Sequence, residues 1–155
     1  MFIRAVRKQH YLWRAIDQGG HVLDILVQSR RNTRAVKRFL CKLLRGLQHV
    51  PRVIVTDKLK SYAAAKRKVL PQIEHRQSKY LNNGIEVSHQ PTQRRERQMQ
   101  RFKSARHAQQ FLSTHSRIHN HFQLRRHHLT ADQHRTARDV AFRTWREVTA
   151  VADVA

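Results

Sequence analysis

Val53-Ile54-Val55-Thr56-Asp57 is the stretch on which the fold depends, a short run of β-branched residues that ends in a single carboxylate. β-Branched side chains favour strands, and a short apolar run between two helical patterns is typical of a buried strand in a βαβ unit. In α/β proteins the active site gathers beyond the carboxyl ends of such strands. The stretch therefore predicts an α/β fold with Asp57 at a functional position.

Helical patterns stand on both sides of this strand. Upstream, Asn32 or Thr33 can cap a helix whose apolar residues recur every three or four positions until shortly before Pro51. Downstream, residues 58–69 predict a second helix, and residues 72–79 predict a short extended segment. The order helix, strand, helix, strand is that of an α/β protein.

The N-terminal third predicts an antiparallel hairpin. Residues 10–16 and 21–27 are rich in apolar and aromatic residues, and Asp17-Gln18-Gly19-Gly20 between them is a turn signal. Residues 2–6 form one more predicted strand, which begins with no turn or cap ahead of it.

The C-terminal half is mostly helical in pattern. Residues 85–100 predict a helix that Pro91 interrupts or kinks, and residues 104–121 predict another. Thr130-Ala131-Asp132 resembles a helix cap, and residues 137–151 predict the final helix. We expect a core domain at residues 1–110 and a helical C-terminal extension at residues 111–155.

The charge of the chain indicates its partner. The 155 residues include 32 Lys and Arg against 10 Asp and Glu, a net charge of +22, and 39% of the residues are hydrophobic. A nucleic acid is the polyanion that such a charge predicts. A basic solvated surface or a ribosome-like structural role is the alternative. A membrane is not expected, because no basic helix has an aromatic face and no run could cross a bilayer.

Two carboxylates on different elements can share a divalent cation. Asp57 ends the predicted strand, and Glu86 lies in the first turn of a predicted helix. Mg²⁺ prefers oxygen ligands and keeps several waters, so that few carboxylates suffice. Each residue also has a simpler interpretation: Asp57 can merely cap the next helix, and Glu86 can merely complement its helix dipole.

Longer motifs carry a resemblance to a known family. Val55-Thr56-Asp57-Lys58-Leu59-Lys60-Ser61-Tyr62 and residues 74–89 resemble bacterial DDE-type insertion-sequence transposases, and the insertion sequence six family in particular. The hairpin at residues 11–17, the Ser29-Arg30-Arg31-Asn32 segment and Arg101-Phe102-Lys103-Ser104 match as well. The resemblance implies a ribonuclease-H-like (retroviral-integrase-like) fold, in which helices flank a mixed five-stranded sheet, with a helical C-terminal tail here.

The family's catalytic triad, Asp, Asp and Glu, binds two Mg²⁺ ions. The resemblance assigns the second Asp to Asp57 and the Glu to Glu86, as catalytic and metal-binding residues. The first Asp stands on the opening strand, just ahead of a segment like Phe2-Ile3-Arg4, and the printed chain begins after that point. Neither Asp17 nor Asp24 matches its position. We therefore expect the polypeptide to be an N-terminally truncated transposase that is inactive alone.

A second departure concerns a basic residue that the family places seven positions after the Glu. Gln93 stands there, followed by Arg94 and Arg95. Either arginine can be the substitute, although a shift of one residue turns a helical side chain by about 100°.

The remaining basic residues predict a DNA surface that binds phosphates without reading sequence. The candidates are Lys58, Lys60, Lys79, Arg94, Arg95, Arg101 and Lys103. Two functional hypotheses follow. The first is Mg²⁺-dependent DNA cleavage and strand transfer in DNA transposition. The second is a non-catalytic DNA-binding remnant, or a partner of full-length transposase or of a second copy. We expect a cytoplasmic protein in either case.

Overall fold

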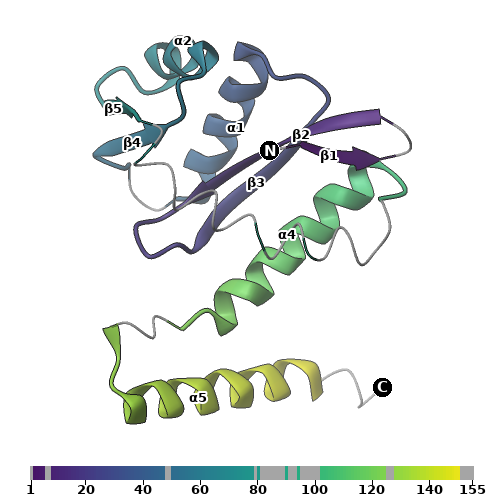
Figure 1. The fold of residues 1–155 in the computed structure, drawn as a ribbon, viewed down its shortest axis with the longest axis vertical. Helices are drawn as coiled ribbons and strands as arrows, with labels where there is room; N and C mark the ends of the chain where they lie inside the picture. The colour runs from purple at the N-terminus through teal and green to yellow at the C-terminus, as the bar shows by residue number, and fades with distance from the viewer. Residues whose placement is uncertain are drawn as a thin grey trace. The chain divides into compact units, whose positions relative to one another are not determined.

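The computed structural model describes residues 2–5, 8–47, 50–78, 80, 90, 94, 102–124 and 128–150. Its elements, in chain order, are β1 (Phe2–Ala5), β2 (Lys8–Ile16), β3 (Val22–Gln28), α1 (Thr33–Gly46), β4 (Val53–Thr56), α2 (Lys60–Val69), β5 (Glu74–Gln77), α4 (Ala105–Phe122) and α5 (Ala131–Ala150) (Figure 1). They fall into two compact units, Met1–Ser113 and Thr114–Ala155. The predicted mixture of helices and strands is confirmed.

The first sheet is antiparallel in the order β1-β2-β3, as the hairpin pattern predicts. Phe2 pairs with Tyr11, and Leu12 pairs with Val27. The turn between β2 and β3 is held by Asp17, whose carboxylate accepts a hydrogen bond from the His21 amide at 2.9 Å. Gly20 has a φ of 82°, which glycine adopts without strain.

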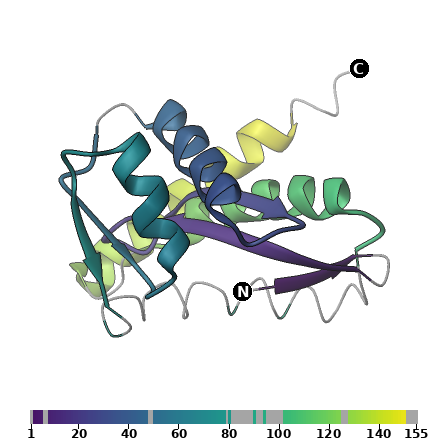
Figure 2. The ribbon, with the colours of Figure 1, turned by 90° about the horizontal axis from the view of Figure 1, so that it is seen from above.

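The second sheet contains the run that ends in Asp57. Strand β4 pairs in parallel with β5, from Val53 beside Glu74 to Thr56 beside Gln77, and α2 connects the two strands (Figure 2). The predicted βαβ unit is therefore present, with β5 shorter than the extended segment that the sequence suggests. The described strands form one three-stranded and one two-stranded sheet, where the resemblance implies a single sheet of five.

Helix α1 begins where a cap can satisfy its first amides. The Asn32 side chain accepts a hydrogen bond from the Ala35 amide at 3.0 Å, so that Asn32 rather than Thr33 is the N-cap. Its buried face contains Ala35, Val36 and Phe39.

Replacing the cap has a measurable cost. Asn32→Ala should lower the free energy of unfolding by about 1 kcal/mol, because it leaves the Ala35 amide without its acceptor. Urea denaturation measures the change. Arg34→Ala, an exposed position in the same turn, should shift stability by less than about 0.5 kcal/mol. Equal losses in the two variants would contradict the capping role.

The core of the first unit lies on both faces of the antiparallel sheet. Trp13 packs with Phe39 and Leu40 of α1 in one cluster, which also includes Ala65 of α2. Leu12, the neighbour of Trp13 on β2, belongs to a second cluster with Phe102 and with Leu112 of α4. Adjacent strand residues point to opposite faces, so α1 and α2 cover one face and α4 covers the other.

The second unit contains the end of α4 and the whole of α5. Phe122 packs against Phe142 and Trp145 at ring-centroid distances of 5.1 and 5.6 Å, and the His121 ring is hydrogen-bonded to the Ala141 carbonyl. No described helix combines the length and the apolar character that crossing a bilayer requires.

The final helix begins at Ala131, so the cap that the sequence predicts at Thr130-Ala131-Asp132 is confirmed, whereas the predicted start of the helix at residue 137 is wrong. A reciprocal capping box explains the earlier start. The Thr130 hydroxyl accepts a hydrogen bond from the Gln133 amide, and the Gln133 side chain accepts one from the Thr130 amide.

Candidate active site

Asp57 lies immediately after β4, at the carboxyl end of the strand. Its side chain is 40% exposed, so that the carboxylate can reach solvent. One carboxylate oxygen, Oδ1, accepts a hydrogen bond from the Leu59 amide at 3.1 Å, ahead of α2. The helix-capping interpretation of Asp57 therefore describes a real contact, but this contact uses only one of the two oxygens.

The second oxygen of Asp57 faces a cation. Arg31 donates from Nη2 to Asp57 Oδ2 at 2.9 Å, and both side chains are partly exposed. Arg31 lies directly ahead of the N-cap of α1, which holds it at this edge of the second sheet. Exposed ion pairs of this kind contribute about 1 kcal/mol or less, so Asp57 can exchange this guanidinium for another cation at little cost.

A hydrogen-bonded chain fixes the backbone next to Asp57. The buried Thr56 hydroxyl donates to the Asp57 carbonyl at 2.9 Å and lies 2.8 Å from His75 Nε2 on β5. Because the hydroxyl proton is used, the histidine is the donor in the second bond, which assigns its proton to Nε2. Burial, and then the charge of Lys66, lower the pKa of His75 below its ordinary value.

This lowered pKa predicts a loss of stability in acid. Below about pH 6.5 the unfolded state binds a proton at His75 that the folded state resists, so stability falls as the pH falls toward the folded-state pKa. We expect His75→Gln to flatten the pH dependence of the urea midpoint between about pH 8 and 5. A variant with the same slope as the parent would contradict this assignment.

Tyr62 of α2 stands beside the carboxylate. Burial raises the pKa of the Tyr62 phenol well above its ordinary value, and Asp57 raises it further while Arg31 opposes the effect. The ring meets Trp13 edge to face, with centroids 5.5 Å apart. Tyr62 therefore stays protonated near neutral pH and forms an uncharged wall of the site.

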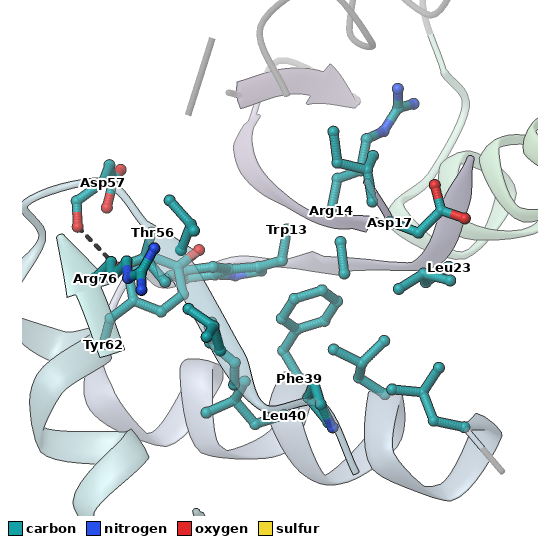
Figure 3. A pocket seen from close by; sticks show the side chains of 18 of the residues that line it. Trp13, Arg14, Asp17, Leu23, Phe39, Leu40, Thr56, Asp57, Tyr62 and Arg76 are labelled. Atoms are coloured by element: carbon teal, nitrogen blue, oxygen red, sulfur yellow. Dashed lines mark hydrogen bonds between the residues drawn. The ribbon is translucent and has the colours of Figure 1, made fainter. Parts of the chain in front are cut away.

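A cavity of about 580 Å³ opens between the two sheets, and Asp57 lies on its border. Figure 3 shows Asp57, Thr56 and Tyr62 at one end, Trp13 and Phe39 in the middle, and Asp17 at the other end. Mainly apolar walls with a few polar groups are typical of binding sites.

The donor groups around Asp57 suit a hard divalent cation only in part. Asp57 provides one exposed carboxylate, which is the ligand type that Mg²⁺ prefers. Among the described residues, no three of His, Cys, Asp and Glu come together as a metal group. Glu86, the other predicted ligand, lies outside the described residues.

The structure describes some of the predicted DNA-binding residues and not others. Lys58 and Lys60 near Asp57, and Arg94 and Lys103 elsewhere, are exposed. The predicted residues Lys79, Arg95 and Arg101, as well as Gln93, lie outside the described part of the chain.

The sequence pattern did not identify Arg31 and His75 as neighbours of Asp57. Arg31 stands within a segment that carries the family resemblance, and this resemblance could have drawn attention to it. Its role as the partner of the Asp57 carboxylate, however, depends on tertiary structure. His75 becomes recognisable only once β5 is paired beside β4.

The family model described as a DDE domain matches residues 1–127. The chain is 33% identical over 110 residues to the transposase for insertion sequence-like element IS431mec of Staphylococcus aureus. This match covers 68% of this chain and 49% of the relative. The transposase for insertion sequence element IS257 in transposon Tn4003, from the same species, matches equally.

A shorter match, 33% identical over 67 residues, is to the uncharacterized protein pYV0051 of Yersinia pseudotuberculosis, and it covers 42% of this chain and 63% of the relative. The chain thus spans about half the length of the Staphylococcus aureus relatives. No solved structure matches it.

Proposed function

Because this chain belongs to the DDE-domain insertion-sequence transposases of the insertion sequence six family, we propose that it carries part of the catalytic centre for DNA transposition. The chemistry is cleavage of a phosphodiester by water, followed by strand transfer through a 3′-hydroxyl. The observation that carries the proposal is the partly exposed carboxylate of Asp57 at the carboxyl end of β4. One of its oxygens pairs with the Arg31 guanidinium, which another cation can replace.

In this proposal Asp57 and Glu86 would hold divalent metal, with Mg²⁺ as the natural ion. A bound pair of such ions stabilises the attacking and leaving oxygens of a phosphoryl transfer. Asp57 would present Oδ2 to the metal while Leu59 keeps Oδ1 in place. Arg31, released from the carboxylate, would then contact a DNA phosphate at the same edge of the sheet.

The surrounding residues keep this carboxylate in position. Thr56 and His75 fix the backbone of Asp57 through their hydrogen-bonded chain. Tyr62 and Trp13 form an aromatic wall of the cavity that Asp57 borders. Fixed donors next to the carboxylate are a feature that makes electrostatic stabilisation effective.

We further propose a ribonuclease-H-like fold for the core at residues 1–110, with residues 111–155 as its helical extension. The antiparallel β1-β2-β3 sheet and the parallel β4-β5 pair support this assignment. In such a fold a mixed sheet joins both sets of strands, and the first Asp of the triad enters on the opening strand.

The polypeptide of residues 1–155 should not cleave DNA when it is expressed alone. In this proposal Asp57 and Glu86 are the second and third carboxylates of the triad and no residue of this polypeptide is the first, whereas two-metal chemistry needs ligands on both sides of the phosphate. The second candidate function is a DNA-binding partner of a complete transposase, which the net charge of +22 favours.

A plasmid assay tests the proposal. Purified protein is incubated with Mg²⁺ or Mn²⁺ and a supercoiled plasmid that carries family-type ends. We expect no nicking from residues 1–155, and nicking from a chain that is extended ahead of Phe2 by the Asp-bearing strand of a relative. If the extended chain folds and binds DNA but still fails to nick, the non-catalytic function is the correct one.

A further inference from the structure

Helix α1 carries a row of cations on its outer face. Arg34, Lys37, Arg38 and Arg45 are exposed, whereas the buried residues of α1 face the core. In an α-helix these four positions fall within about 100° of one another around the axis, and they extend over about 16 Å along it. We name this row the α1 stripe.

The charge of the α1 stripe is not balanced within the part of the chain that the structure describes. Arg38 donates to the side chain of Gln28 at 3.5 Å, which is a neutral partner. The other three members form no ion pair with a described residue. The ion pair that α1 does form there joins Lys42 to Asp24, and Lys42 lies outside the stripe.

This arrangement works against the stability of the helix. Like charges three or four positions apart repel each other on a helix, as Arg34 does with Lys37 and Arg38. Arg34 also stands in the first turn of α1, which contains no acidic residue, although the positive end of the helix dipole disfavours cations. Helix α2, which lies beside α1 (Figure 2), contains no acidic residue either. The stripe therefore does not stabilise the fold, and an anionic partner would offset its repulsion.

The composition of the α1 stripe indicates which anion it suits. It contains no aromatic side chain onto which the bases of a single strand could stack. It contains no large apolar side chain either, because the residue between its cations is Cys41. A protein partner needs an interface core from which charges are depleted. A row of cations without such groups suits the phosphates of a duplex.

A duplex held at Asp57 does not reach the α1 stripe. Ile54 of β4 packs beneath α1 in the same core cluster as Phe39, so the stripe and β4 lie on opposite sides of α1. A helix with its side chains is about 10 Å thick. Asp57 follows the end of β4, at the edge of these layers. Duplex DNA is stiff over about 150 base pairs, so a short segment that crosses this edge does not also bend over the outer face of α1.

We propose that the α1 stripe binds the phosphate backbone of a second duplex segment, in addition to the segment at Asp57, so that one chain holds two duplexes. The length of the stripe corresponds to about five base pairs at 3.4 Å each. Phosphate contacts do not read sequence, so this segment can have any sequence. The inference rests on the proposed DNA-binding function and adds four residues that lie outside the predicted DNA surface.

Cys41 makes occupation of the α1 stripe directly measurable, because it is the single cysteine of the chain and is partly exposed between the cations. Its alkylation by N-ethylmaleimide is followed in about 50 mM salt, where phosphate contacts are strong. The probe is a random duplex of about 12 base pairs, just over one helical turn. At a duplex concentration of about ten times Kd the rate should fall about ten-fold, because only the unoccupied fraction reacts. Fluorescence anisotropy should give two duplexes per chain.

A triple variant removes the proposed contacts without disturbing the core, since all its positions are exposed. It should bind one duplex per chain and lose the protection of the thiol, with an unchanged circular dichroism spectrum. The variant is Arg34→Gln, Arg38→Gln, Arg45→Gln.

The matched control removes the same charge from exposed positions on α5, in the other unit. It should keep both duplexes and the protection of Cys41. The control is Arg138→Gln, Arg143→Gln, Arg146→Gln. A thiol moved to α5 by Cys41→Ser and Thr144→Cys should react at the same rate with and without duplex.

The outcomes separate this inference from the proposed function. Duplex binding that leaves Cys41 fully reactive would overturn the inference and leave the proposed function intact. Absence of duplex binding at any salt concentration would overturn the proposed function itself. Protection of Cys41 with only one duplex per chain would show a single continuous track and would overturn the second segment. Equal protection by polyglutamate of the same charge would overturn the duplex in favour of an acidic protein.

Discussion

Replacing Asp57 by Asn in the chain extended ahead of Phe2 should lower plasmid nicking by on the order of 10³-fold or more. The substitution keeps the size of the side chain and its acceptor toward the Leu59 amide, but it removes the negative charge that a divalent cation needs. Residues that act as one catalytic unit are costly to remove singly. Initial nicking rates in Mg²⁺ and in Mn²⁺ measure the effect.

Asp139→Asn on α5 is the matched control, since it is the same substitution at an exposed position in the other unit. It should leave the nicking rate unchanged. Circular dichroism and DNA affinity of the Asp57 variant should equal those of the parent, so that a loss of folding is distinguished from a loss of chemistry. Wild-type nicking by the Asp57 variant would exclude this residue as a metal ligand.

DNA affinity should fall by roughly 10³ to 10⁵ between 50 and 200 mM salt. If all seven proposed basic residues contact phosphates, the slope of log K against log salt is −0.9 × 7, or about −6. We expect this salt dependence because the net charge is +22 and because those of the seven basic residues that the structure describes are exposed. A random duplex suffices, because phosphate contacts do not read sequence.

The double variant Lys58→Ala, Lys60→Ala should make this slope shallower by about 2, since each lost phosphate contact removes about 0.9. Arg138→Ala, Arg143→Ala on α5 removes the same charge from exposed positions in the second unit. Equal changes in the two double variants would show that the net charge, rather than the surface next to Asp57, governs DNA binding.

The elements that depend on local pattern could be predicted from the sequence. The hairpin, the capped helix α1 and the β4-α2-β5 unit follow from alternation, capping residues and β-branched runs. The cap of α5 at Thr130 was also predictable, but residues 131–136 were not assigned to the helix because these first turns are polar. Tertiary pairing, by contrast, is not local, so the division of the strands into two sheets was not foreseen.

From the sequence, a residue of the candidate site could be predicted only if it stood at the end of a strand or within a recognisable motif. Asp57 met both conditions. The Arg31 contact and the His75 hydrogen bond join residues 26 and 19 positions apart, and no sequence period connects such distances. The pKa of His75 likewise depends on burial and on Lys66, which only the folded arrangement brings together.

Gln109 has a consequence for how the protein can self-associate. Its side-chain amide bonds the outer backbone of β3 as a neighbouring strand would, so that this border of the sheet offers no template to a further chain. Concentrated solutions should therefore not grow open-ended fibres through this border of the sheet.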